Sequence, residues 1–211
     1  MAKARAIVVY GAGGHGKVVA DAAASAGLEV LGFLDDRRAI GEELAFGRVL
    51  GGSGWWRDYP DVHVVLGVGD NSARQRLGAE LARDGRQPCG VVHPSAVVSR
   101  AASLGPGVVV LALAVINAGA RIEEGAIINS AAVVEHDVSV GAYAHVSPHA
   151  TLAGAASLGE LSQLGAAACV LPGVVVGPRC LVGAGAVVTR EVPGGSVCVG
   201  VPARVTRELE P

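Results

Sequence analysis

The second half of the chain is mostly aliphatic, so its few reactive side chains stand out. His136 has a carboxylate on each side, Glu135 and Asp137, and Asn129 lies shortly before it. A carboxylate beside an imidazole fixes the tautomer of the ring and stabilises the imidazolium, as a general base requires. The alternative is an ordinary surface histidine. We predict that the catalytic group of this protein consists of His136, Asp137, Glu135 and Asn129.

The stretch that must position these residues repeats every six positions. Each sixth residue from Val92 to Val188 is aliphatic, and a small or slim residue stands four positions after each, from Ala96 to Val192. A helix would repeat near 3.6 residues and a half-buried strand at 2, so neither fits. Hexapeptide repeats are typical of a parallel β-helix. Three hexapeptides per triangular coil would stack residues 18 apart at roughly 4.8 Å.

The repeat also predicts where the two histidines lie on the coil. His136 is the third residue of the hexapeptide that begins at Val134, which is a corner, and its stacked neighbours are the small residues Ala118 and Gly154. We therefore expect an accessible imidazole. His145 falls half a coil later on the outward side of a strand, so one chain cannot bring the two rings together. If both serve one site, that site lies between subunits, and a cyclic homotrimer would supply three such sites.

The first 91 residues have the alternation of an α/β domain. An apolar strand at 6–11 runs directly into a glycine loop at 11–17 and a helix to about Ala26. A second strand at 30–34 ends on Asp35 and Asp36, a loop segment follows, and a third strand at 62–68 leads to Gly69 and a helix from Ser72 to about Arg83. This order predicts a Rossmann-like βαβ domain over 1–91, followed by the repeat domain with its tail over 92–211.

The glycine loop admits more than one ligand. It matches G-x-G-x-x-G with an acidic residue about 20 positions on, a pattern associated with dinucleotides. NAD needs two mononucleotide halves, and the segment before Val92 has room for about one. The N–H groups of the loop and of the helix N-terminus can still bind a diphosphate. We therefore favour a nucleotide-diphosphate ligand over NAD, with a purely structural strand-to-helix turn as the alternative.

The net charge and composition of the chain limit the classes of partner that we expect. The net charge of -2 gives no reason to expect nucleic acid. Only 3% of the residues are aromatic against 51% hydrophobic, which suits a narrow repetitive core. The sequence has no apolar run long enough to span a membrane and no cleavable leader, so we expect a cytoplasmic protein. The spacing of the four cysteines does not indicate a metal site, and we expect them to be reduced.

Several motifs together resemble one enzyme family. They are YGAGGHGKVV at the start, FLDD, GVGDN, VVHPSA, INSAAVVEHD, GAYAHVSPHATLAG and GVPAR near the end. This set is similar to the bacterial sugar O- and N-acetyltransferases of the left-handed β-helix superfamily, in particular those acting on sialic acids, UDP-4-amino sugars of the bacillosamine pathway and GDP-perosamine. The resemblance covers nearly the whole chain and implies a left-handed coil.

The resemblance also implies roles for individual residues. His136 corresponds to the base that deprotonates the sugar amine, and Asp137 to the acidic residue that supports it. His145 corresponds to a contact of the acetyl-CoA thioester, with Ala166 and Ala184 along the CoA groove, and we assign Arg204 to a CoA phosphate from its charge. The expected nucleotide-sugar contacts are Gly13, Gly14, His15, Asp35, Asp36 and Gly69.

The implied reaction is direct transfer from acetyl-CoA to an amine. The enzyme aligns the amine with the thioester carbonyl, accepts its proton and stabilises the oxyanion, and it needs neither a metal nor an acyl-enzyme. The expected function is N-acetylation of a nucleotide-linked 4-amino-4,6-dideoxy sugar for surface glycans. Two alternatives stay open: O-acetylation of a sialic acid-type sugar, and a non-catalytic scaffold or NAD-binding protein. The nucleotide, whether UDP, GDP or dTDP, is not indicated.

Overall fold

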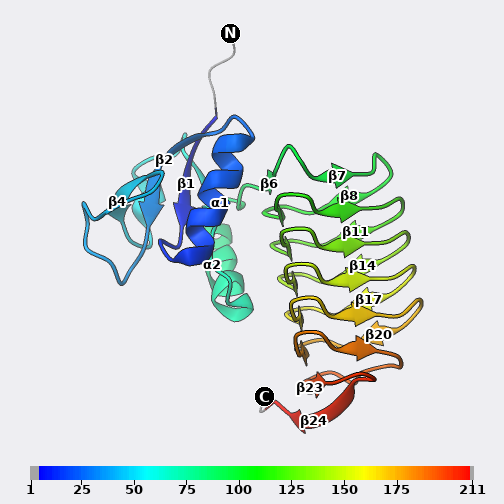
Figure 1. Ribbon diagram of the computed structural model, residues 1–211. Coiled ribbons are helices and arrows are strands. Elements are labelled where there is room, and N and C mark those ends of the chain that lie inside the picture. The colour runs from blue at the N-terminus through cyan, green and yellow to red at the C-terminus, as the bar shows by residue number, and fades with distance from the viewer. Residues whose placement is uncertain (1–4, 210–211) are drawn as a thin grey trace.

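The chain folds into an α/β part and a three-sided prism of stacked coils. A computed structural model describes residues 5–209. In Figure 1 the α/β part lies beside the first coils of the prism, with α1 (Gly14–Ser25) between its sheet and the prism and α2 (Asn71–Arg83) below α1. The described residues include no helix that is both long and apolar enough to cross a membrane.

The α/β part contains one five-stranded sheet. The strand order is β3-β4-β2-β1-β5, and β5, β1, β2 and β4 run parallel. The strands are β1 (Ala6–Tyr10), β2 (Glu29–Leu34), β3 (Glu43–Leu44), β4 (Gly47–Gly51) and β5 (His63–Leu66). The βαβ unit agrees with the prediction from the sequence. It supplies a single mononucleotide-type half, in which β1 lies between β2 and β5.

Two strands of this sheet, β3 and β4, were not predicted. Residues 47–51 form β4, which pairs with β2 and forms a hairpin with β3, where we expected only loop. The segment has glycine at both ends and one fully buried apolar residue, Val49, so its sequence gives little strand signal. A 3₁₀ turn, η1 (Trp55–Arg57), follows, and Trp55 stacks on Tyr59 with ring centroids 3.9 Å apart.

The prism has three faces, each a parallel sheet of two-residue strands. The docking face contains β6 (Val91–Val92), β9 (Val109–Val110), β12 (Ile127–Ile128), β15 (His145–Val146), β18 (Gln163–Leu164) and β21 (Leu181–Val182). The valine face contains β7 (Val97–Val98), β10 (Val115–Ile116), β13 (Val133–Val134), β16 (Thr151–Leu152), β19 (Cys169–Val170) and β22 (Val187–Val188). The serine face contains β8 (Ser103–Leu104), β11 (Arg121–Ile122), β14 (Ser139–Val140), β17 (Ser157–Leu158) and β20 (Val175–Val176). Paired residues are 18 apart, as the hexapeptide predicts.

The inward positions of the repeat form one continuous core. The large residues from Val110 to Val188 are buried, and the small ones from Ala114 to Ala186 fill the corners between them. The first coil is the exception: Val92 is 38% exposed and Val98 and Leu104 are only partly buried, because no coil covers them at the open end. Most corners place one residue in the left-handed region, and Asp137 does so at φ 61°. Aspartate tolerates this conformation better than most residues.

The last strands close the other end of the prism. β23 (Ser196–Val199) continues the docking face, and β24 (Arg204–Glu208) turns back antiparallel to it. Between them the backbone N–H of Ala203 donates to the carbonyl of Val187 at 2.8 Å. This bond holds the start of β24 beside the last strand of the valine face.

The two parts share an apolar interface. Ala22 and Ala23 of α1 belong to one buried cluster with the outward side chains Val91, Val109 and Ile127 of the docking face. The outward residues of the same face lower down, Gln163 and Leu181, are only partly buried. The α/β part therefore covers the upper half of one face and leaves the other two faces bare.

Candidate active site

A cavity of about 710 Å³ lies at the carboxyl ends of β1, β2 and β5, against α2. Its lining comes from four segments and is listed here: Tyr10, Gly11, Asp35, Asp36, Arg37, Val68, Asp70, Ala73, Arg76, Leu77 and Glu80. Open α/β sheets bind ligands at this edge, and the volume lies in the usual range of ligand pockets. The cavity is the candidate nucleotide site.

The glycine loop borders the cavity and is built for close packing. A Cβ on Gly16 would stand 1.7 Å from the carbonyl oxygen of Gly11, so only glycine lets α1 approach the loop. At Gly13 and Gly14, by contrast, a Cβ would meet nothing within 4 Å. Gly13 caps α1 without a side-chain hydrogen bond, and the first turn has no acidic residue. The open N-terminus of α1 can therefore face an anion.

The two acidic residues after β2 have different partners. The Asp35 carboxylate accepts the N–H groups of Ala12 and Arg37, both at 2.9 Å, and so holds the glycine loop. The Asp36 carboxylate accepts the hydroxyl of Tyr10 and, at 2.7 Å, the N–H of Ser53. Both were predicted as substrate contacts, and both line the cavity.

The predicted base lies on the opposite side of the prism. His136 is in the corner between the valine and serine faces, and its side chain is 63% exposed. Its Nδ1 is 2.9 Å from Oδ2 of Asp137, which is 69% exposed. Gly154 lies one coil below the ring, so only backbone and no side chain covers that side of it. The arrangement leaves Nε2 directed away from the carboxylate that orients the imidazole.

The other two residues of the predicted catalytic group face elsewhere. Glu135 accepts a hydrogen bond from the amide of Asn117 at 2.9 Å, so the carboxylate that orients His136 is that of Asp137. The amide of Asn129 lies 2.9 Å from Nε2 of His145. Asn129 therefore positions His145 in this chain, and its role towards His136 stays a prediction.

His145 is outward on the docking face but covered by the α/β part. It is 8% exposed, and its ring centroid lies 6.1 Å from that of His15 in α1. Burial, followed by the nearby Arg74 cation and by His15, lowers the pKa of His145 to about 3. Burial and Arg74 likewise lower the pKa of His15 to about 4. Gly69 lies beside His15, since a Cβ built on Gly69 would stand 4.0 Å from the Cβ of His15.

The predicted CoA contacts follow one corner. Ala166 and Ala184 are exposed and stack one coil apart in the corner between the docking and valine faces, joined through the bond from the N–H of Gly185 to the carbonyl of Ala166. Arg204 begins β24 and is exposed. It follows Ala203, which is bonded to Val187 at the foot of the same corner. Their contacts with CoA stay predictions.

One functional residue escaped the sequence analysis. Arg74 is completely buried and donates to the carbonyl oxygens of Gly125 and Tyr143 in the prism, both at 2.7 Å, and to that of Val68 in the α/β part at 3.0 Å. Its side chain therefore joins the α/β part to the prism through hydrogen bonds. Nothing in its sequence neighbourhood distinguishes it from a solvent-exposed helix arginine.

Three further cavity residues were also missed. Arg76 and Glu80 lie on α2 with Ala73 and Leu77, one helical face at the spacing i, i+3, i+4 and i+7, and Arg37 follows Asp36. That spacing was visible in the sequence. A helix that starts at the carboxyl end of a strand presents one face to that edge of the sheet. The spacing of Ala73, Arg76, Leu77 and Glu80 could therefore have identified this face as part of the cavity.

A glycine-loop α/β domain followed by a hexapeptide prism with an exposed histidine at one corner defines a class of sugar acyltransferase. Residues 6–81 match the family model of the PglD N-terminal domain. The acetyltransferase domain of PglB from Neisseria gonorrhoeae FA1090 matches with 38% identity and a TM-score of 0.90, covering 95% of this chain and 99% of that one.

Two other relatives agree. PerB from Caulobacter crescentus, solved in complex with CoA and GDP-perosamine, matches with 38% identity and a TM-score of 0.89 over 96% of this chain and 97% of that one. UDP-N-acetylbacillosamine N-acetyltransferase of Bacillus subtilis (strain 168) is 36% identical over 118 residues, 50% of this chain and about half, 51%, of that protein. The chain belongs to the hexapeptide-repeat, left-handed β-helix acetyltransferase family.

Proposed function

We propose that this protein transfers acetyl from acetyl-CoA to the amino group of a nucleotide-linked 4-amino-4,6-dideoxy sugar for surface glycan biosynthesis. The observation that carries the proposal is the exposed His136 with its Nδ1 held by Asp137, in a chain that also has a nucleotide-sized cavity. The relative solved with CoA and GDP-perosamine, which resembles this chain over nearly its full length, supports the same ligand pair.

The geometry fits a direct attack. Asp137 accepts the hydrogen bond of Nδ1–H, which leaves Nε2 of His136 as the proton acceptor for the attacking amine. Amine nitrogen and thioester carbonyl then form a tetrahedral intermediate, whose oxyanion a corner N–H can stabilise. Collapse breaks the C–S bond, and the proton held by His136 passes to the departing thiolate. Asp137 stabilises the imidazolium between these two steps.

We infer that the complete site lies between subunits of a homotrimer. In one chain His136 lies on the corner away from the docking face, while the nucleotide cavity lies beyond that face. The outward residues of the valine face form an apolar stripe, mostly half-buried or exposed: Val97, Val115, Val133, Thr151, Cys169 and Val187. A bare apolar sheet face favours self-association. The His136 corner forms one border of this face and the Ala166 corner the other.

The acetyl donor fits the second of these corners. Ala166 and Ala184 offer exposed backbone with small side chains, and Arg204 brings a positive charge to the foot of the corner. His145 lies near the upper end of this corner, where the α/β part covers it, and the Nε2 of the neighbouring His15 has no hydrogen-bond partner among the described residues. Buried ring nitrogens of this kind usually meet an ordered water or a ligand atom. Since both co-substrates are cytoplasmic metabolites, we place the enzyme in the cytoplasm.

The test is an assay of CoA thiol release with acetyl-CoA and a panel of UDP-, GDP- and dTDP-linked 4-amino sugars. Release with one of them, and a product amide that survives mild base, supports the proposal. A base-labile product would indicate an ester and favour the sialic acid-type O-acetyltransferase. Release with none of these acceptors would contradict the proposal.

A further inference from the structure

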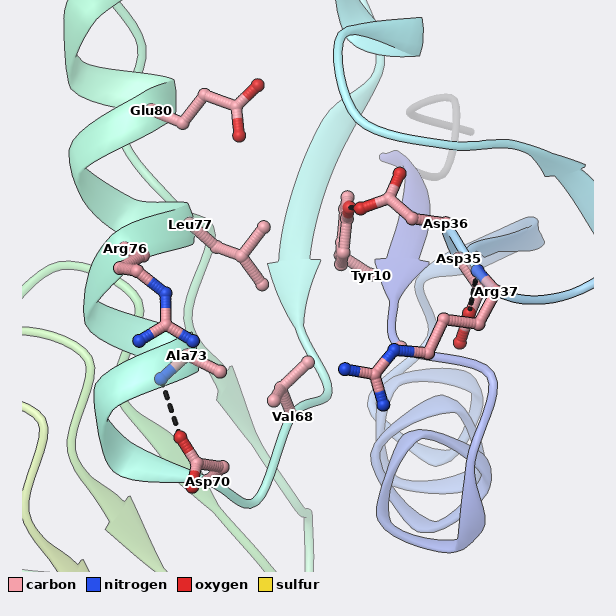
Figure 2. A pocket seen from close by; sticks show the side chains of 11 residues that line it. Tyr10, Asp35, Asp36, Arg37, Val68, Asp70, Ala73, Arg76, Leu77 and Glu80 are labelled. Atoms are coloured by element: carbon pink, nitrogen blue, oxygen red, sulfur yellow. Dashed lines mark hydrogen bonds between the residues drawn. The ribbon is translucent and has the colours of Figure 1, made fainter.

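Charge is divided between the two ends of the nucleotide cavity. Figure 2 shows the guanidinium groups of Arg37 and Arg76 on either side of Val68, with Glu80 and Asp36 towards the other end, on opposite sides of the view. Within residues 5–209 neither of these arginines forms an ion pair. The cavity therefore has two arginines without an ion pair to a described residue at one end, where Asp35 and Asp70 already accept backbone N–H groups, and the carboxylates of Asp36 and Glu80 at the other end.

The carboxylate end is a fixed arrangement. Ser53 joins both acids, since its N–H donates to Oδ1 of Asp36 and its hydroxyl to Oε1 of Glu80, each at 2.7 Å. Tyr10 donates to the other oxygen of Asp36, and burial and this bond raise the pKa of the phenol, which keeps it a donor. Both oxygens of Asp36 are thus engaged. Glu80 accepts one hydrogen bond, from Ser53, with Arg57 3.9 Å from Oε1, so a second lone pair on Oε1 and all of Oε2 stay available to a ligand.

The chemistry of the nucleobases distinguishes what such an end can hold. Guanine presents two adjacent donors, N1–H and the 2-amino group, which match the oxygens of a carboxylate. Uracil and thymine present a single N–H between two carbonyl oxygens, so a carboxylate that accepts the N–H also faces an oxygen. Burying like charges and lone pairs together is unfavourable.

The cationic end fixes the direction of the ligand. The glycine loop, where a Cβ at Gly13 or Gly14 would meet nothing within 4 Å, leads into the uncapped N-terminus of α1, and Gly11 of this loop lines the cavity. A diphosphate that contacts this loop would be flanked by Arg37 and Arg76. The base then reaches towards Glu80, between the side chains of Tyr10 and Leu77.

We propose that the cavity selects a guanosine diphosphate, with the Glu80 carboxylate accepting N1–H and the 2-amino group of guanine. The inference rests on the proposed function and names its nucleotide. Glu80 is the specificity-determining residue, and Asp36 with Ser53 holds it in place. The sugar on the diphosphate then extends past the glycine loop and out of the cavity.

Titration calorimetry without acetyl-CoA tests this directly. We expect wild-type protein to bind GDP at least about tenfold more tightly than UDP, dTDP or IDP, which lacks only the 2-amino group, as the loss of one charge-assisted hydrogen bond predicts. In Glu80→Gln the ratio of GDP to IDP affinity should fall towards one. The matched control is Glu43→Gln, at an exposed glutamate of β3 outside the cavity, which should keep the wild-type ratio.

The outcomes separate the two proposals. UDP or dTDP binding as tightly as GDP, or an unchanged GDP to IDP ratio in Glu80→Gln, overturns the guanine assignment and leaves the acetyltransferase proposal standing. Guanine selectivity without thiol release from any GDP-linked amino sugar overturns the proposed function alone. If no nucleoside diphosphate binds, both fail. The wild-type comparison of GDP with IDP needs no variant, so a misfolded variant does not block the test.

Discussion

Gly154 lies directly below the imidazole of His136, and a Cβ built on it would stand 2.6 Å from Nε2. The ring tip can swing away from such a methyl group, whereas the coil need not move. Gly154→Ala should therefore displace the imidazole with little effect on the unfolding midpoint. We expect kcat to fall by about tenfold to a hundredfold, as for a base misplaced by about an ångström. Thiol release and thermal melting measure both effects.

The matched change above the ring is Ala118→Gly. It removes a methyl group from the other side of His136 and should leave kcat near the wild-type value. Equal losses in both variants would mean that the loss in Gly154→Ala does not come from the methyl group displacing the ring.

The pairing of His136 with Asp137 gives a second prediction. His136→Asn should lower kcat by about 10²- to 10⁴-fold, the usual worth of a general base. Asp137→Asn keeps a residue that tolerates the left-handed conformation and should lower kcat by about tenfold or more at unchanged KM, because the imidazole loses its orienting carboxylate. Asp137→Glu should restore most of the rate. The control is His63→Gln at the start of β5, and full activity of His136→Asn would contradict the assignment.

The coil geometry of the site was predictable, whereas its long-range contacts were not. Exact stacking at 18 residues placed His136 between Ala118 and Gly154, so the exposure of its ring followed from counting. The partner of Asn129 did not follow, because a side chain can reach along a corner to a residue 16 positions away. The role of Arg74 depends on how the two parts dock, and a hexapeptide pattern contains no information about that.

Self-association through the valine face can be tested at Val133. Its side chain points outward from β13 in the middle of the apolar stripe. Val133→Glu should convert the proposed trimer into monomers that retain the fold, and thiol release should be lost because no partner completes the site. Sedimentation equilibrium gives the mass. Ile40→Glu, at a residue 76% exposed in the α/β part, is the control and should stay trimeric. A fully active trimer of Val133→Glu would exclude this face.

Arg74 predicts a link between stability and domain docking. Arg74→Leu removes the donor from the carbonyl oxygens of Gly125 and Tyr143, which stay buried beneath α2. The free energy of unfolding should fall by about 3 kcal/mol or more, as expected when buried acceptors lose a charged donor. Hydrogen exchange should rise first in α2. Arg83→Ala, an exposed residue of the same helix, should change stability by less than about 0.5 kcal/mol.

His145 predicts a loss of stability in acid. Its pKa is about 3 in the folded chain, where it faces Arg74, His15 and Asn129, and about 6.5 in the unfolded chain. Below pH 6.5 the unfolded chain takes up a proton that the folded chain does not, so the contribution is complete above pH 6.5 and decreases towards pH 3. From pH 6.5 to 5 the loss is about 2 kcal/mol for this residue alone.

Urea unfolding at several pH values measures this loss, and His15 adds to it in the same direction. His145→Gln should flatten the profile by the share of one histidine. An identical slope in the variant and the wild type would show that the imidazole titrates normally.

The contacts of α2 with the corners at Gly125, Tyr143 and Leu161 attach the nucleotide cavity at a set height on the prism. Along the prism, positions equivalent to this attachment recur only once per coil, at intervals of roughly 4.8 Å. A relative that must accommodate a longer sugar cannot change the height of the cavity along the prism by a fraction of this spacing, because strand pairing fixes it. Such a relative has to gain a whole coil of 18 residues, or α2 has to attach to the prism one coil higher or lower.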